Sequence, residues 1–137
     1  MKYGLAMVGL DNGLFKAPFT EHGTITGLKK LNKPEEDYTA VTFEFKFGSG
    51  DEDKGSGTIT RYKDGTVDAM YEGSVMMGGK RFEWQSIETG KVDKDGKTVK
   101  GLEIVTFPHS PEQNSFIMET EMDLSDETFT NTVYQWK

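Results

Sequence analysis

The chain has 137 residues, with 23 acidic and 16 basic side chains, a formal net charge of -7 and no cysteine. This length suits a single domain, residues 1–137, that buries roughly 68% of the surface of its unfolded chain. The lack of cysteine excludes disulfides and thiolate metal sites. The negative charge disfavours nucleic acid and anionic membrane surfaces as partners.

The N-terminal apolar stretch from Leu5 to Leu10 is shorter than the hydrophobic region of a signal peptide or a membrane span. We therefore expect a cytoplasmic protein that does not enter a membrane. A mature chain from which a signal peptide had been removed would carry the same features, so that alternative stays open.

Strand signals dominate, because no window keeps apolar residues at helical spacing over three turns. Residues 3–10 form either a short strand or a docked arm, and the glycine-rich acidic segment 48–57 is expected to be a loop. In chain order, we expect strands near 20–31, 38–47, 56–63, 66–77, 80–94, 97–108, 113–124 and 127–137.

Short turns separate these strands. Asp64-Gly65, Gly78-Gly79 and Asp95-Gly96 are dipeptides that two-residue hairpin loops prefer, because such loops need positive φ. Ser125-Asp126 is a weaker turn signal. The two prolines in 108–111 exclude a continuing central strand there.

Sequential hairpins predict an all-β fold, an antiparallel up-and-down meander that closes into a small barrel of about eight strands. An open, curled sheet packed on the N-terminal segment is the alternative. The predicted architecture resembles calycin-type barrels, which typically bind small apolar ligands, and also small barrel cyclases and isomerases. The resemblance covers strand number, strand order and length only. The G-x-W signature of lipocalins is absent, so no family residue is carried over.

A two-residue turn fixes which residues face each other across a hairpin. These registers place Tyr62 opposite Val67, Gly73 opposite Trp84 and Val92 opposite Val99. The predicted inner face then consists of Val41, Phe43, Phe45, Phe47, Tyr62, Val67, Tyr71, Val75, Phe82, Trp84, Val105, Phe107, Phe116, Met118, Met122, Phe129 and Val133.

The same registers predict an apolar row on the outer face, which some other surface must cover. Either the N-terminal segment covers it, with Leu14 and Phe15 among its apolar residues, or a second subunit does, which would make the protein a homo-oligomer. The row consists of Ile59, Met70, Ile87, Ile104, Ile117 and Tyr134.

Two carboxylates fall on the predicted inner face. Glu88 and Glu103 are direct cross-strand neighbours, with Cβ atoms roughly 5 Å apart. In a poorly hydrated interior one of them would keep a proton. They are the candidate catalytic acid and base. Gly90 and Gly101 come next, followed by Thr120 and Asn131, a set typical of a cavity floor.

Two alternatives limit this interpretation. A three-residue turn with a bulge at Gly96 would shift the register by one and turn Glu103 outward. In the second alternative, Glu88 lies at a hydrated barrel mouth, where a carboxylate needs no functional explanation.

The leading functional hypothesis is a module that binds a small apolar or amphipathic molecule inside the barrel. A cofactor-free isomerase, cyclase or decarboxylase is the second, and an oligomeric scaffold is the third. We expect no cofactor and no metal, because His22 and His109 are too far apart in sequence to suggest a ligand pair. The candidate ligand-binding residues are Tyr62, Tyr71, Trp84, Ser86, Phe107, Met118, Thr120 and Asn131.

Overall fold

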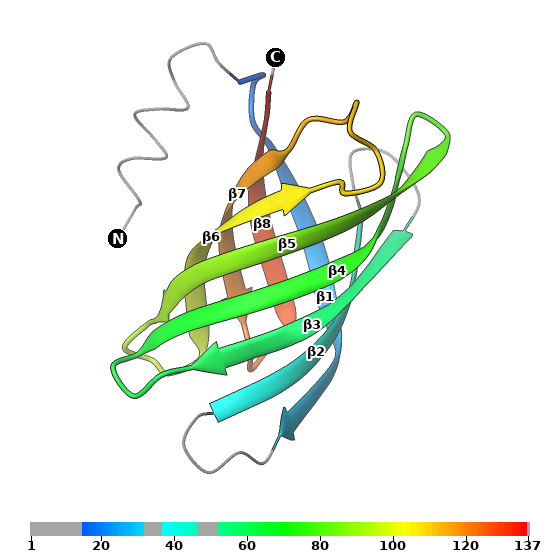
Figure 1. The fold of residues 1–137 in the computed structure, drawn as a ribbon. Coiled ribbons are helices and arrows are strands. Elements are labelled where there is room, and N and C mark those ends of the chain that lie inside the picture. The colour runs from blue at the N-terminus through cyan, green and yellow to red at the C-terminus, as the bar shows by residue number, and fades with distance from the viewer. Residues whose placement is uncertain (1–14, 32–36, 47–51, 137) are drawn as a thin grey trace.

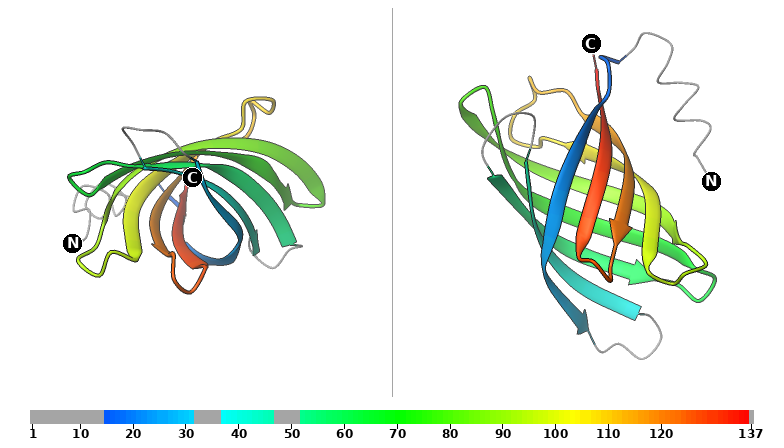
Figure 2. Two further views of the ribbon diagram at one scale, coloured as in Figure 1. Left: turned by 90° about the horizontal axis from the view of Figure 1, so that it is seen from below. Right: turned by 180° about the vertical axis from the view of Figure 1, so that it is seen from behind.

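The computed structural model describes residues 15–31, 37–46 and 52–136. Eight antiparallel strands close into a barrel, in which each strand pairs with the next and β8 returns to β1 (Figure 1). Seen from behind, β1 and β8 lie side by side (Figure 2). The strands are β1 (Phe19–Leu31), β2 (Asp37–Lys46), β3 (Glu52–Arg61), β4 (Thr66–Met77), β5 (Lys80–Val92), β6 (Thr98–Thr106), β7 (Phe116–Asp123) and β8 (Thr128–Gln135).

This architecture confirms the predicted eight-stranded up-and-down barrel and excludes the open sheet. The predicted strand 56–63 was wrong at both ends, because β3 begins at Glu52 and ends at Arg61. The glycine-rich segment 48–57 is therefore not all loop. Its glycines Gly55 and Gly57 lie within the sheet, opposite Phe43 and Val41 of β2.

The turn between β4 and β5 behaves as predicted. Gly78 and Gly79 have φ angles of 58° and 76°, the left-handed backbone that a type I′ hairpin turn requires. Met77 accordingly pairs with Lys80, and Gly73 lies opposite Trp84.

The turn at Asp64-Gly65 is one residue longer than predicted. The Tyr62 amide donates to the Thr66 carbonyl at 2.9 Å, and the Gly65 amide donates to the Tyr62 carbonyl at 3.0 Å. The Asp64 carboxylate stabilises this longer loop, because it accepts the Thr66 amide at 2.9 Å and the Thr66 hydroxyl at 2.6 Å. Consequently Arg61, and not Tyr62 as predicted, pairs with Val67.

A register shift of one residue moves every side chain of a strand to the opposite face. Ile59, predicted to lie in the outer row, is therefore buried in the barrel core, and Tyr62, predicted to point inward, is exposed at 36%. Gly57, and not Thr58, faces Tyr71.

The other registers were predicted correctly. The loop after β5 has four residues, 94–97, and its Gly96 amide donates to the Asp93 carbonyl at 2.9 Å. This loop keeps Val92 opposite Val99, so the bulge that would have turned Glu103 outward is absent from it.

The predicted outer row survives on five strands. Met70, Ile87, Ile104, Ile117 and Tyr134 face one another from β4 to β8. Met70, Ile87 and Ile104 are exposed, whereas Tyr134 is buried and Ile117 is half-buried against it.

Phe15 covers the β8 end of this row. Its ring meets Tyr134 edge-on at 6.4 Å and stacks on Trp136 at 4.4 Å. Residues 1–14, proposed from the sequence as a cover for the whole row, lie outside the described residues. Coverage by a second subunit also stays a prediction.

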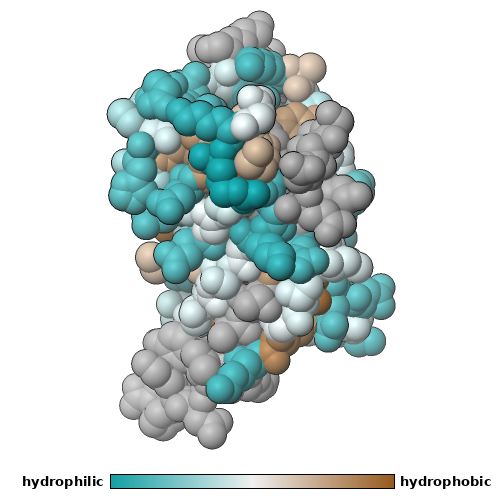
Figure 3. Space-filling model, turned by 90° about the vertical axis from the view of Figure 1, so that its right-hand side faces the viewer, coloured by the Kyte–Doolittle hydropathy of each residue, from teal (hydrophilic) through white to brown (hydrophobic). Residues whose placement is uncertain are grey.

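A cluster of buried apolar side chains fills much of the barrel. On the side shown in Figure 3, hydrophilic side chains are spread over the surface, with smaller apolar areas between them. No helix long and apolar enough to cross a membrane occurs in the part of the chain that the structure describes.

We predict that Gly73→Ala lowers the free energy of unfolding by about 1–3 kcal/mol, the usual effect of overpacking a filled interior. A Cβ atom at Gly73 would lie 2.3 Å from the Lys54 carbonyl oxygen and 2.7 Å from the Trp84 ring. Urea unfolding followed by circular dichroism measures the change. Glu72→Ala, at the neighbouring exposed position, serves as the control. Equal stability of the two variants would contradict the close approach.

Candidate functional site

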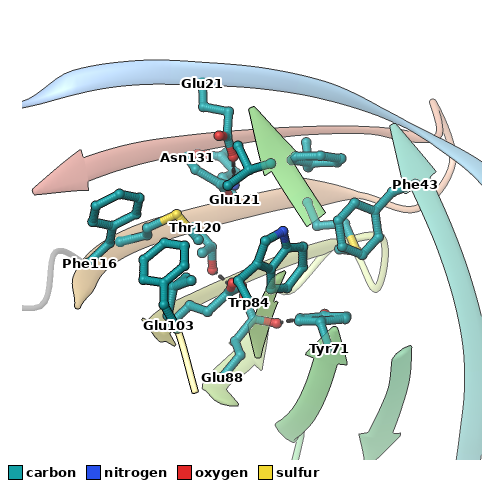
Figure 4. A pocket seen from close by; sticks show the side chains of 16 residues that line it. Glu21, Phe43, Tyr71, Trp84, Glu88, Glu103, Phe116, Thr120, Glu121 and Asn131 are labelled. Atoms are coloured by element: carbon teal, nitrogen blue, oxygen red, sulfur yellow. Dashed lines mark hydrogen bonds between the residues drawn. The ribbon is translucent and has the colours of Figure 1, made fainter. Parts of the chain in front are cut away.

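A cavity of about 50 Å³ lies inside the barrel and has both aromatic and carboxyl groups in its wall. This volume has room for a few water-sized groups. Figure 4 shows the side chains around it. The wall includes Glu21, Phe43, Tyr71, Trp84, Glu88, Glu103, Val105, Phe107, Phe116, Met118, Thr120 and Asn131.

Glu88 on β5 is held between two hydroxyl groups (Figure 4). Tyr71 on β4 donates to Glu88 Oε1 at 2.9 Å, and Thr120 on β7 donates to Glu88 Oε2 at 2.5 Å. The second bond spans β6, where Gly101 lies between the two partners. A Cβ atom at Gly101 would lie 3.3 Å from Glu88 Cγ and 3.2 Å from Thr120 Oγ1. Because Gly101 has no side chain, the Glu88 carboxylate can reach the Thr120 hydroxyl across β6.

Glu103 on β6 lies directly opposite Glu88, and both are buried, each 7% exposed. Ser86 is the polar neighbour of Glu103, where its hydroxyl favours the ionised carboxyl. The Ser86 hydroxyl is itself buried and makes no hydrogen bond of regular geometry to the described residues. Glu103 thus has weaker polar support than Glu88.

This difference sets the order in which the pair ionises. Burial raises the pKa of Glu88, against the hydrogen bonds from Thr120 and Tyr71, which lower it. Burial and then the charge of Glu88 raise the pKa of Glu103 well above its ordinary range. Because two hydroxyls stabilise the carboxylate of Glu88, Glu88 ionises first and Glu103 keeps its proton. The site thus holds a proton acceptor beside a proton donor.

Glu21 on β1 is a third buried carboxyl, which the sequence analysis missed. It pairs with Asn131 across the closure of the barrel, and Asn131 Nδ2 donates to Glu21 Oε1 at 2.8 Å. Burial raises the pKa of Glu21 to about 7, opposed by the Asn131 hydrogen bond and assisted by the charge of Asp53. The alternation of Glu21, Gly23 and Ile25 was the only local signal, and no hairpin turn fixes its direction.

Aromatic rings form another part of the cavity wall. Phe43 and Trp84 have ring centroids 6.2 Å apart, and Phe43 meets Tyr71 edge-on at 5.5 Å. Gly55 and Gly73 lie between Phe43 and Trp84 in the sheet. Because these two positions have no side chains, the rings of Phe43 and Trp84 lie over bare backbone.

Most predicted site residues lie inside the barrel, although their role in binding or catalysis remains a proposal. Tyr62 is the exception, because it is exposed beyond the end of β3. For Val41 and Phe45 only the backbone is described, and Phe47 lies outside the described residues. The buried predicted residues are Tyr71, Trp84, Ser86, Glu88, Glu103, Phe107, Met118, Thr120 and Asn131.

The two histidines lie on the surface. His22 contacts the Thr130 hydroxyl at 3.3 Å, and His109 lies 3.6 Å from the Glu83 carboxylate. Within residues 15–31, 37–46 and 52–136, no three histidine, aspartate or glutamate side chains are grouped to hold a metal ion.

Two solved structures share this fold. A protein of unknown function from Clostridium acetobutylicum superposes with a TM-score of 0.64 at 10% identity, over 90% of this chain and 99% of that one. A conserved protein of unknown function from Rhodopseudomonas palustris gives a TM-score of 0.59 at 11% identity, over 88% of this chain and 95% of that one. No family model and no curated protein matches the sequence. At these identities the likeness establishes the barrel fold alone.

We predict that Glu21→Gln changes how stability depends on pH. The pKa of Glu21 rises on folding from 4.5 to about 7, so the unfolded chain loses this proton first as the pH increases. The wild type therefore loses stability between these values, by about 3 kcal/mol in total. Glutamine cannot ionise, so the variant should gain about this amount relative to the wild type between pH 4 and pH 8.

Urea unfolding at pH 4 and pH 8 measures this gain. Glu72→Gln, a substitution of the same charge at an exposed position of β4, should show no comparable gain. If Glu21→Gln shifts stability by the same amount at both pH values, Glu21 is not the buried acid described above.

Proposed function

We propose that this protein binds a small molecule inside the barrel, with a polar group of the ligand at Glu88 and Glu103 and its apolar part among the aromatic rings. The observation that carries the proposal is a cavity with two adjacent buried carboxyls in a wall made mostly of aromatic and aliphatic side chains. Ligand sites typically combine an apolar wall with a few convergent polar groups.

The desolvation cost of the buried carboxyls favours a binding role over a purely structural one. Burying carboxyl groups costs free energy, and an apolar pair of similar volume is often as stable or more stable. The Ser86 hydroxyl lacks a regular partner, and Glu103 has little hydrogen-bond support. A ligand with hydrogen-bonding groups would satisfy both.

We predict that a small apolar fluorescent probe binds the barrel and quenches Trp84. Trp84 lines the cavity, and the chain has two tryptophans, so Trp136→Phe leaves Trp84 as the single indole. In this background Val105→Phe should weaken probe binding about tenfold or more, because the larger ring fills the cavity.

Ile104→Phe is the matched control, because Ile104 precedes Val105 on β6 but points outward and is 46% exposed. It should bind the probe as the parent does. Equal loss in both variants, or no binding by the parent, would contradict binding inside the barrel.

A second candidate is a cofactor-free acid–base enzyme, such as an isomerase. The specific observation in its favour is that the two neighbouring carboxyls favour opposite protonation states, which pairs a general acid with a general base. Glu103 would donate a proton to a bound substrate and Glu88 would accept one. Tyr71, a neutral phenol hydrogen bonded to Glu88, would help to orient that base.

We predict that one buried carboxyl titrates above about pH 6 in carbon-detected NMR, whereas an ordinary glutamate titrates near 4.3. Glu103 should be that group, and Glu88→Gln should lower its pKa because the charge of Glu88 is one cause of the shift. Ordinary pKa values for both groups would exclude the acid–base candidate.

A further inference from the structure

The wall of the smaller cavity has acidic side chains and, among the described residues, no basic one to pair with them. Glu21, Glu88 and Glu103 contribute carboxyls to the cavity, and no lysine, arginine or histidine lines it among the described residues. An ionised carboxyl in such a place is unfavourable unless a cation or several hydrogen-bond donors accompany it. A ligand that balances these carboxyls would therefore carry a positive charge.

The rings beside Glu88 suit a cation. Phe43 packs edge-on against Tyr71 and tilted against Trp84, with ring centroids 5.5 and 6.2 Å apart. The Tyr71 hydroxyl contacts Glu88, so these rings adjoin the carboxylate. Aromatic faces attract cations, most strongly where water is excluded.

A second, larger cavity lies on the other side of the same rings. It has a volume of about 690 Å³, and Phe43 and Trp84 line both cavities. Gly55 and Gly73 also line the larger cavity, and the paired strands β2 to β5 separate it from the interior.

The larger cavity is also negative in balance. Its wall includes three glutamates, Glu44, Glu72 and Glu83, against Lys54 and His109. Lys54 already lies 3.6 Å from Glu44. A cleft lined by one sign of charge concentrates ligands of the opposite sign.

From these contacts we infer that the ligand is a small organic cation, a protonated amine with an apolar chain. Its ammonium group binds between Glu88 and Glu103, within reach of the Ser86 hydroxyl. Its chain packs against Phe107 and Phe116. This inference rests on the proposed binding function and specifies the chemical class of the ligand.

Binding of a cation should release protons. The ionisable groups that line the cavity are Glu21 from β1, Tyr71 from β4, Glu88 from β5, Glu103 from β6 and Glu121 from β7. Burial and the charge of Glu88 raise the pKa of Glu103 well above its ordinary value, and a cation beside it would favour its ionised form. A neutral ligand gives no such release.

Isothermal titration calorimetry with the full chain tests this inference. Butylammonium and the neutral butanol, which differ little in shape, are titrated at pH 7 in two buffers of different ionisation enthalpy. We expect butylammonium to bind about tenfold or more tightly than butanol, a difference that a buried charge pair readily supplies, with release of up to one proton. Glu103→Gln should abolish the release and weaken amine binding by a similar factor, and it should weaken butanol binding much less, because glutamine still offers a hydrogen bond to a hydroxyl group.

Glu112→Gln is the charge-matched control, because Glu112 is exposed and pairs only loosely with Lys80, at 4.0 Å. If the two variants lose amine binding equally, the amine binds through overall charge and the inference is wrong. If butanol or the apolar probe binds but butylammonium does not, the cation inference fails and the binding function stands. If no probe binds, both fail.

Discussion

The hydrogen bond from Thr120 to Glu88 connects two strands that are not neighbours, and the interior depends on it. It passes over Gly101, where a Cβ atom would crowd both partners. Because this bond and the one from Tyr71 hold the Glu88 carboxylate in place, Glu88 becomes the more acidic member of the pair. Glu103, directly opposite, then keeps its proton. Hydrogen bonds that favour one member of a coupled pair thus turn two identical side chains into an acceptor and a donor.

Much of this arrangement could be predicted from the sequence, because tight turns translate local residues into long-range pairing. Gly78-Gly79 set the β4–β5 register, and the pairing of Glu88 with Glu103 followed from the loop around Gly96. The prediction failed at Asp64-Gly65 for a local reason. The Asp64 carboxylate binds Thr66 and stabilises a longer loop, which reversed the faces of Ile59 and Tyr62. Dipeptide signals alone do not separate these two loop lengths.

Glu21 could not be predicted in this way, because β1 meets β8 only when the barrel closes. The Glu21–Asn131 contact joins residues 110 positions apart, with no turn between them to set a register. The register of β1 against β2 also shifts between Ile25 and Gly27, so its inward positions cannot be counted from the neighbouring hairpin. Long-range closure therefore decides whether the cavity wall has two buried acids or three, a difference that changes the electrostatics of the interior.

Three buried acids around one cavity are hard to explain by stability. Ala69 lies opposite Glu88 and Met118 opposite Glu103, and an apolar side chain in place of Glu103 would avoid the desolvation of a carboxyl. The acids give the cavity carboxyl groups that need protons or a positive charge to be stable, and the rings around them pack over bare glycine backbone. A protein that needed only a filled barrel would gain nothing from these carboxyls. A protein that takes up a polar or cationic guest would use it to favour the bound state over the empty one, because the guest removes the penalty of the buried charge.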